Sequence, residues 1–173
     1  MRRVEPTPPC PPVLDPAGSP GAEERARAIA HFTAEGWEEK KFTFSAYQVD
    51  EVREALLDAF NGVCAYCEAP LPSIEVEHFR PKGSVRTGDG QRKPGYYWLA
   101  ATWENLLPSC HNCNTDLWTE HPDGTRRKTG KGTWFPLEDE GARATAEGEE
   151  ANERPLLLHP YEDDPTEHLE FVE

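Results

Sequence analysis

Long hydrophobic segments are missing from this sequence. No stretch approaches the roughly 20 apolar residues that a membrane-spanning helix needs, and the start at Met1 runs into proline-rich sequence instead of the apolar core of an export signal. We therefore expect a cytoplasmic protein without a membrane anchor. Only 36% of the residues are hydrophobic, and 17 prolines and 13 glycines favour loops. So small a core usually needs an additional stabilising element.

Positive charge is also scarce. The 18 Lys and Arg residues stand against 32 Asp and Glu, which gives a net charge of −14 and argues against an ordinary nucleic-acid-binding protein. Two clusters, Arg80 to Lys93 and Arg126 to Lys131, are nevertheless basic, and thirteen acidic residues fall between Glu138 and Glu173. The basic clusters could bind a phosphate backbone or could be solvated loops, and composition alone leaves both readings open.

Cysteine is rare, but its spacing is informative. Four of the five cysteines form two C-x-x-C pairs, at Cys64/Cys67 and Cys110/Cys113, with 42 residues between the pairs. In a reducing compartment such pairs are more often metal ligands than disulfides, and two of them supply the four thiolates of a tetrahedral zinc. A redox-active pair is the alternative, but no thioredoxin-like βαβ pattern surrounds either motif. Because four cysteines leave no open coordination position, we predict a structural Zn²⁺.

The chain divides into four expected parts: a proline-rich tail without regular structure that could bind a partner, a helical segment, a zinc-stabilised core, and an acidic linker with a C-terminal segment. These parts are residues 1–20, 21–62, 63–137 and 138–173. In the helical segment, the pattern predicts one helix over 21–35 and another that Asp50 caps and that Asn61-Gly62 ends.

Further elements are expected within the last two parts. We predict a strand at 73–79, a hairpin within 83–95, and buried aromatic rings in and after Tyr96-Tyr97-Trp98. A helix should begin at Cys110. The stretch 141–153 should be a linker, and the three leucines at 156–158 should form a short buried strand or an extended segment.

Polar residues between and beside the cysteine pairs suggest phosphodiester chemistry. Such hydrolysis needs a base, a cation and fixed geometry between them. His78 is suited to be the base because neutral imidazole accepts a proton near physiological pH. Glu77 and Asn114 offer oxygen ligands for Mg²⁺ or Mn²⁺, and Arg80 and Lys82 are candidates for contacts with nucleic-acid phosphates. A lone histidine beside a glutamate is more often a structural residue, but two cysteine pairs frame this one.

The order C-x-x-C, Glu-His-x-x-Pro, Asn-Leu, C-x-x-C-Asn resembles the HNH (ββα-metal) endonucleases. From about Asn61 to Tyr161 the chain is similar to the HNH nuclease partner of Septu and retron-associated antiphage defence systems. The motifs that carry this similarity are C-A-Y-C-E, V-E-H-F-R-P-K, Y-Y-W-L-A, W-E-N-L and W-F-P-L. The resemblance implies an α+β fold, with a ββα-metal core on the four-cysteine zinc scaffold, N-terminal helices and irregular tails. It also implies that Glu77 and Asn114 hold the catalytic metal, and that Asn105 braces the loop and orients His78.

The sequence departs from the family pattern at one position that matters for the site. Family members commonly carry Lys three residues after Asn114, where this chain has Leu117. Basic residues of the following stretch, 118–132, could substitute for it, and this stretch looks like an insertion.

The resemblance implies a DNA endonuclease that is the effector of a bacterial defence complex with an ABC- or SMC-like ATPase partner. Two alternatives stay open: a catalytically silent, zinc-stabilised adaptor, and a free-standing restriction-type nuclease.

Overall fold

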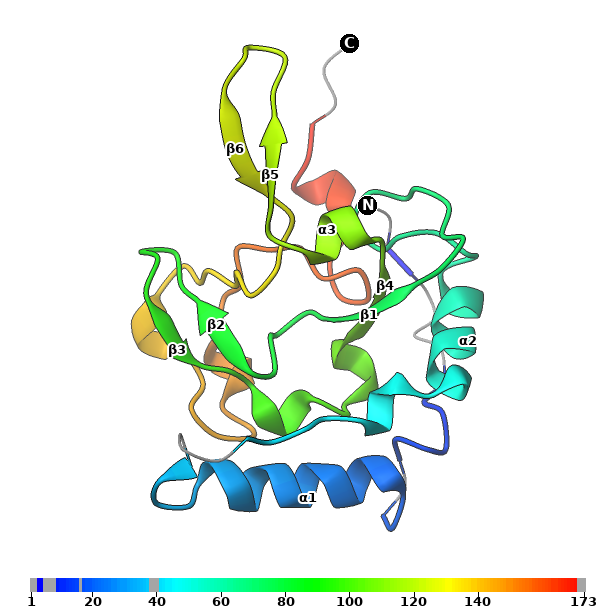
Figure 1. The fold of residues 1–173 in the computed structure, drawn as a ribbon, viewed down its shortest axis with the longest axis vertical. Coiled ribbons are helices and arrows are strands. Elements are labelled where there is room, and N and C mark those ends of the chain that lie inside the picture. The colour runs from blue at the N-terminus through cyan, green and yellow to red at the C-terminus, as the bar shows by residue number, and fades with distance from the viewer. Residues whose placement is uncertain (1–2, 5–8, 16, 38–40, 171–173) are drawn as a thin grey trace.

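The computed structural model describes residues 3–4, 9–15, 17–37 and 41–170. Figure 1 shows helix α1 along one side of the molecule and helix α2 at an adjacent edge, around small antiparallel sheets. The helices are α1 (Pro20–Phe32), α2 (Asp50–Ala59) and α3 (His111–Asn114). The strands are β1 (Glu75–His78), β2 (Ser84–Arg86), β3 (Arg92–Pro94), β4 (Leu106–Ser109), β5 (Leu117–Glu120) and β6 (Arg126–Thr129). The predicted α+β class is confirmed, and no helix in the described residues could cross a membrane.

Helix α1 begins within the proline-rich segment. The Ser19 hydroxyl accepts a hydrogen bond from the Ala22 N–H at 3.1 Å, and a proline fills the first helical position, where no N–H is needed. The helix stops at Phe32, three residues before the predicted end. Leu14 is buried against the start of the helix, where a Cβ on Gly21 would lie 2.6 Å from the Leu14 carbonyl oxygen. The described residues before α1 therefore pack on the body, and the rest of the predicted tail lies outside the described residues.

Helix α2 confirms the second predicted helix with one correction. Val49 is the capping residue, and Asp50 is the first residue of the helix, so the predicted cap is wrong by one position. An acidic residue is still favourable there, because the first turn carries the positive end of the helix dipole. Asn61 and Gly62 have φ of 52° and 71°, the left-handed conformation that ends helices.

The strand pair β1 and β4 lies between two core clusters. The pairing is antiparallel, with Glu77 opposite Leu107 and His78 opposite Leu106. Leu106 packs in the cluster with α2, whereas Leu107 packs in the cluster of aromatic rings. Successive residues of a strand point to opposite sides, so this short sheet is enclosed on both faces.

The predicted strand at 73–79 is confirmed as β1, and the predicted hairpin as β2 and β3. Tyr96, Trp98 and Trp103 are buried, as expected for core rings, and Tyr97 is half-buried. The helix expected from Cys110 is a single turn, α3, because the backbone adopts an extended conformation at Thr115. The stretch 118–132 forms most of the hairpin of β5 and β6, which projects from the body (Figure 1).

The C-terminal part differs most from expectation. Residues 141–153 are not an unpacked linker, since Arg143, Ala144 and Glu153 are buried. The Glu153 carboxylate accepts hydrogen bonds from the Tyr96 hydroxyl and the Ala144 N–H, at 2.7 and 2.9 Å. The buried strand at 156–158 is wrong as well, because Leu156 is 63% exposed and the segment lacks strand pairing.

Candidate metal and active site

The four paired cysteines come together at one point. Their sulfur atoms lie within 4.8 Å of one another, and the Cys67 and Cys110 sulfurs are 3.8 Å apart. A tetrahedral zinc with Zn–S bonds of about 2.3 Å would place its ligand sulfurs about 3.8 Å apart. The spacing therefore fits a zinc ion, and these cysteines could hold one.

Backbone groups around the cluster favour a thiolate at Cys64. Burial by itself would raise the pKa of this thiol, but N–H donors, among them that of Cys110 at 3.4 Å from the sulfur, bring it down to about 7. Thiolate is the form that binds zinc. The first cysteine pair is also attached to the sheet, because the Ala65 N–H donates to the Pro108 carbonyl of β4 at 2.9 Å. Two chain segments distant in sequence are thus held at one end of the β1 and β4 pair.

His78 is buried at the end of β1, beside a cleft. Its Nε2 lies 2.9 Å from the Ala100 carbonyl oxygen, which can only accept, so Nε2 carries the hydrogen and Nδ1 keeps a lone pair. Burial lowers the pKa of His78 well below its usual value, and the nearby charge of Lys82 lowers it further. The imidazole is therefore neutral near pH 7, which is the form a general base needs.

The cleft has a volume of ≈ 700 Å³, and Glu77, His78, Lys82 and Asn114 all line it. The structure thus brings together four of the side chains that the sequence singled out. The Lys82 ammonium lies 3.3 Å from His78 Nδ1 and above the ring of Tyr47. The Lys82 ammonium can therefore neutralise the charge of a phosphate group that approaches His78.

Glu77 is paired with a lysine that comes from the hairpin insertion. The Lys131 ammonium lies 2.6 Å from Glu77 Oε1 and 2.9 Å from the His78 carbonyl oxygen, and the Glu77 and Lys131 side chains are each 7% exposed. Burial raises the pKa of Glu77 even though Lys131 opposes this rise, and burial lowers the pKa of Lys131. The pair shows that the site accommodates a cation against Glu77.

Asn114 stands on the single turn of α3, over β1. Its Nδ2 donates to Glu75 Oε2 at 2.5 Å, and Nδ1 of His111 lies 2.7 Å from the other Glu75 oxygen. Because Nδ2 is engaged, Oδ1 is the atom left to bind a cation. Glu75 and His111 were not among the predicted site residues, although Glu75 stands two residues before Glu77, on the same face of the strand.

Asn105 is buried and braces the loop next to His78. Its Oδ1 accepts from the Arg80 N–H at 2.7 Å, and its Nδ2 donates to the carbonyls of Arg80 and Leu99 at 3.0 and 3.1 Å. Leu99 precedes Ala100, the hydrogen-bond acceptor of His78. The described contacts include no direct hydrogen bond between Asn105 and His78, so the predicted hydrogen bond to the imidazole is absent there and Asn105 contacts only the neighbouring backbone.

Arg80 lies away from this cleft. Its Nε is 2.9 Å from the buried Glu153 carboxylate, and its guanidinium lies over the ring of Phe135. These contacts make Arg80 part of the internal frame, so of the two predicted phosphate contacts only Lys82 faces the cleft.

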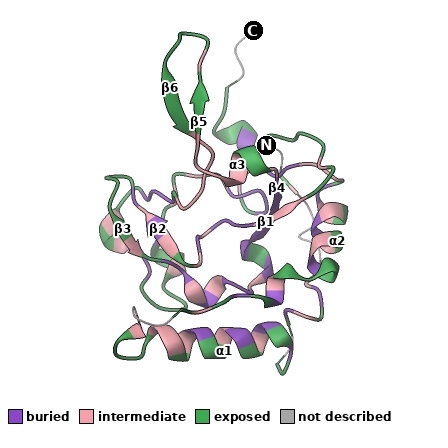
Figure 2. Ribbon diagram, viewed as in Figure 1, coloured by how far each residue is buried: buried purple, intermediate pink, exposed green. Residues whose placement is uncertain are grey.

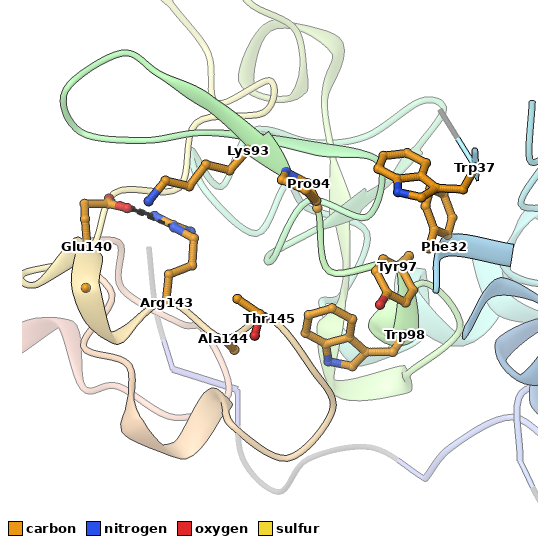
Figure 3. A pocket seen from close by; sticks show the side chains of 12 residues that line it. Phe32, Trp37, Lys93, Pro94, Tyr97, Trp98, Glu140, Arg143, Ala144 and Thr145 are labelled. Carbon is orange, nitrogen blue, oxygen red and sulfur yellow. Dashed lines mark hydrogen bonds and ion pairs between the residues drawn. The ribbon is translucent and has the colours of Figure 1, made fainter. Parts of the chain in front are cut away.

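A second cavity, of ≈ 490 Å³, opens between the end of α1, β3 and residues 140–145 (Figure 3). Rings of Phe32, Trp37 and Tyr97 line it, and the guanidinium of Arg143 is bound to Glu140. Its lining includes no histidine or cysteine among the described residues, in contrast to the cleft at His78.

Comparison with known proteins confirms the resemblance to Septu. The chain is 46% identical over 136 residues to Septu protein PtuB of Bacillus mycoides (strain KBAB4), and this aligned region covers 76% of this chain and 42% of that protein. It is 40% identical over 67 residues to Septu protein PtuB of Bacillus thuringiensis, 36% of this chain and 22% of that protein. It is also 32% identical over 119 residues to Septu protein PtuA of Bacillus mycoides, 66% of this chain and 15% of that protein.

The chain therefore spans less than half the length of each of these curated relatives. No family model matches it, and no solved structure matches it.

Proposed function

We propose that this chain is a metal-dependent HNH endonuclease, which hydrolyses phosphodiester bonds in DNA as the effector of a Septu-like antiphage defence system. The observation that carries the proposal is the meeting, in one cleft, of the side chains of Glu77 and Asn114 with a neutral His78, whose unprotonated Nδ1 lies 3.3 Å from the Lys82 ammonium. The succession of β1, β4 and α3 supports a ββα-metal core, because α3 contacts β1 and carries Asn114.

In this reaction, His78 Nδ1 takes the proton of a water molecule that attacks the phosphorus. The bond to the 3′ oxygen breaks and this oxygen takes a proton from solvent water, which leaves a 5′-phosphate and a 3′-hydroxyl. Glu77 and Asn114 would hold Mg²⁺ or Mn²⁺, which when bound stabilises the negative charge on the phosphate and the leaving oxygen. Ala100 fixes the tautomer of His78, Asn105 holds the backbone on which that contact depends, and Lys82 binds the phosphate.

The zinc ion on the four cysteines has a structural role in this proposal. Four thiolates close the coordination sphere, so zinc stabilises the fold and positions α3 over β1. Similarity to proteins named Septu PtuB and Septu PtuA supports a partner within the same system, and we propose that this partner is an ATPase that presents or senses the nucleic acid.

One observation favours a second function, a zinc-stabilised adaptor without catalysis. The Lys131 ammonium already neutralises Glu77, which is what a catalytic cation would do. In a silent adaptor this ion pair would be permanent.

Cleavage assays distinguish the two functions. The purified chain, with and without its ATPase partner, is incubated with plasmid and single-stranded DNA in Mg²⁺ or Mn²⁺. Wild type is compared with His78→Ala and with His168→Ala, whose histidine is exposed and outside the cleft. We expect cleavage by wild type and His168→Ala only, with equal zinc content in all three. Absence of metal-dependent cleavage under every condition would refute the nuclease and leave the adaptor, whereas undiminished cleavage by His78→Ala would refute the role of His78 as the base.

A further inference from the structure

The hairpin of β5 and β6 presents basic residues away from an acidic body. Figure 1 shows it projecting beyond α3, and Figure 2 shows that most of its surface is exposed. We propose that one face of this hairpin, the arm face formed by Trp118, Arg126 and Lys128, binds a nucleic-acid strand with unpaired bases. The inference deepens the proposed function and rests on it, because the arm face would guide the strand toward the cleft at His78.

The register of the hairpin gathers these three residues on one side. Trp118 pairs with Lys128, and Glu120 pairs with Arg126, whereas Arg127 pairs with Thr119 on the opposite side. Glu120 therefore shares the arm face, yet no ion pair joins it to Arg126 in the described part of the chain. On the hairpin itself two cations stand against one carboxylate, and Lys128 is also paired with Asp116 at 2.9 Å, so Arg126 supplies most of the positive charge of the arm face in a chain of net charge −14.

Trp118 has an unusual environment for an indole. It is 59% exposed, and the Arg126 guanidinium and the Lys128 ammonium each lie 5.9 Å from its ring centroid. An exposed aromatic ring beside two cations suits a nucleobase stacked on the indole with its phosphates on the cations. An acidic protein segment would satisfy the cations and leave the indole unused, so we favour a nucleic acid. A base within an intact duplex could not reach the ring.

The root of the hairpin is fixed to the candidate active site. Gly130 has φ +82°, and a Cβ there would clash with the carbonyl oxygens of Thr115 and Asn112, so the chain passes directly against the backbone of α3 and its C-cap. The next residue, Lys131, donates its N–H to the Cys113 carbonyl at 2.7 Å, and its ammonium binds Glu77. The direction in which the hairpin projects is thus set by the second cysteine pair and by β1.

A charged path joins the arm face to the cleft. Asp116, which lines the cleft, lies 2.9 Å from the Lys128 ammonium and 3.0 Å from the Arg86 guanidinium. Arg86 in turn lies over the half-exposed ring of Trp134. One carboxylate shared by two cations holds both in place and leaves a net positive charge, so the positive surface continues from the hairpin toward the cleft.

Binding is tested by fluorescence anisotropy with a labelled single-stranded oligonucleotide of about 16 nucleotides, the upper site size of common single-strand binders. The full chain carries His78→Ala and zinc, with no Mg²⁺ or Mn²⁺ added. We expect Trp118→Ala to weaken binding about 5- to 150-fold, from the effect of losing one stacked base. Arg126→Ala should weaken binding and reduce the salt slope by about 0.7, which corresponds to one phosphate contact on a single strand. Arg127→Ala, with equal charge loss on the opposite face, should change neither.

Three results would overturn the proposal: no binding by the parent chain, equal weakening by Arg126→Ala and Arg127→Ala, or no effect of Trp118→Ala. Competition by poly-glutamate as effective as that by unlabelled oligonucleotide would instead indicate an acidic protein partner, and would also overturn it. Zinc content and circular dichroism verify that each variant is folded. Because binding is measured without cleavage, failure of the arm face and failure of the nuclease are separate outcomes.

Discussion

Replacing Lys131 by methionine should leave the Glu77 carboxylate buried without a counter-ion. The ammonium and the carboxylate are 2.6 Å apart, and both side chains are 7% exposed, so water would compensate for little of the missing charge. Loss of one partner from a buried ion pair costs about 3–5 kcal/mol of unfolding free energy. We expect Lys131→Met to fall in this range. Lys128→Met is the matched control, because Lys128 is exposed and its pairing with Asp116 should contribute less than about 1 kcal/mol.

The directions of the two pKa shifts predict what happens when both charges are removed. Burial raises the pKa of Glu77 and lowers that of Lys131, so for each group the cost of leaving water outweighs the attraction of its partner. A buried pair of this kind can be replaced by neutral groups at little cost. The double variant Glu77→Gln/Lys131→Met should therefore recover most of the loss and lie within about 1 kcal/mol of wild type.

Urea unfolding of the four proteins in this cycle, at constant zinc, measures the coupling between the two residues. Mn²⁺ should stabilise Lys131→Met more than wild type, since a divalent ion can take the place of the ammonium at Glu77. A loss below about 1 kcal/mol in Lys131→Met, or single losses that simply add in the double variant, would show that the pair is not coupled as the geometry requires.

Three further predictions concern the frame of the site. Cys113→Ser should lose zinc, measured by elemental analysis of the purified protein, because the tetrahedral set is then incomplete. Asn105→Ala should lower the unfolding free energy in urea by about 2–3 kcal/mol, because a partly buried N–H and two partly buried carbonyls lose their partner. Gly130→Ala should lower the melting temperature far more than Gly124→Ala in thermal unfolding: both have positive φ, but only at Gly130 would the Cβ meet the Thr115 carbonyl.

The sequence was most informative where structure depends on local spacing. Two C-x-x-C pairs predicted a four-cysteine cluster, because each pair has to place its two sulfurs on one tight turn whatever the rest of the fold does. Asn61-Gly62 predicted the end of α2 for a similar reason, since few residues tolerate a positive φ. The gathering of Glu77, His78 and Asn114 came from the resemblance, because no local rule brings a strand and a distant helical turn together.

Glu153 shows why composition misled the prediction for residues 141–153. The stretch is rich in glutamate and alanine, which is typical of a solvated linker. A glutamate in such a stretch becomes a buried acceptor only if donors from elsewhere reach it, and here they come from Tyr96 and Arg80, far away in sequence. The same contact removed Arg80 from the phosphate-binding residues. Long-range pairing of this kind leaves no periodic signal in the sequence.

Net charge misleads for the same reason, since it sums groups that the fold separates. Some of the carboxylates are neutralised by buried ion pairs: Glu153 pairs with Arg80, and Glu77 pairs with Lys131. Arg126 and Lys128, by contrast, are exposed beside Trp118, on a hairpin that stands clear of the body. Screening limits exposed charges to a range of about 8–10 Å at physiological salt, so a strand on the arm face experiences mainly these cations. An acidic chain can therefore present a surface for nucleic acid, provided that the surface projects from the rest of the molecule.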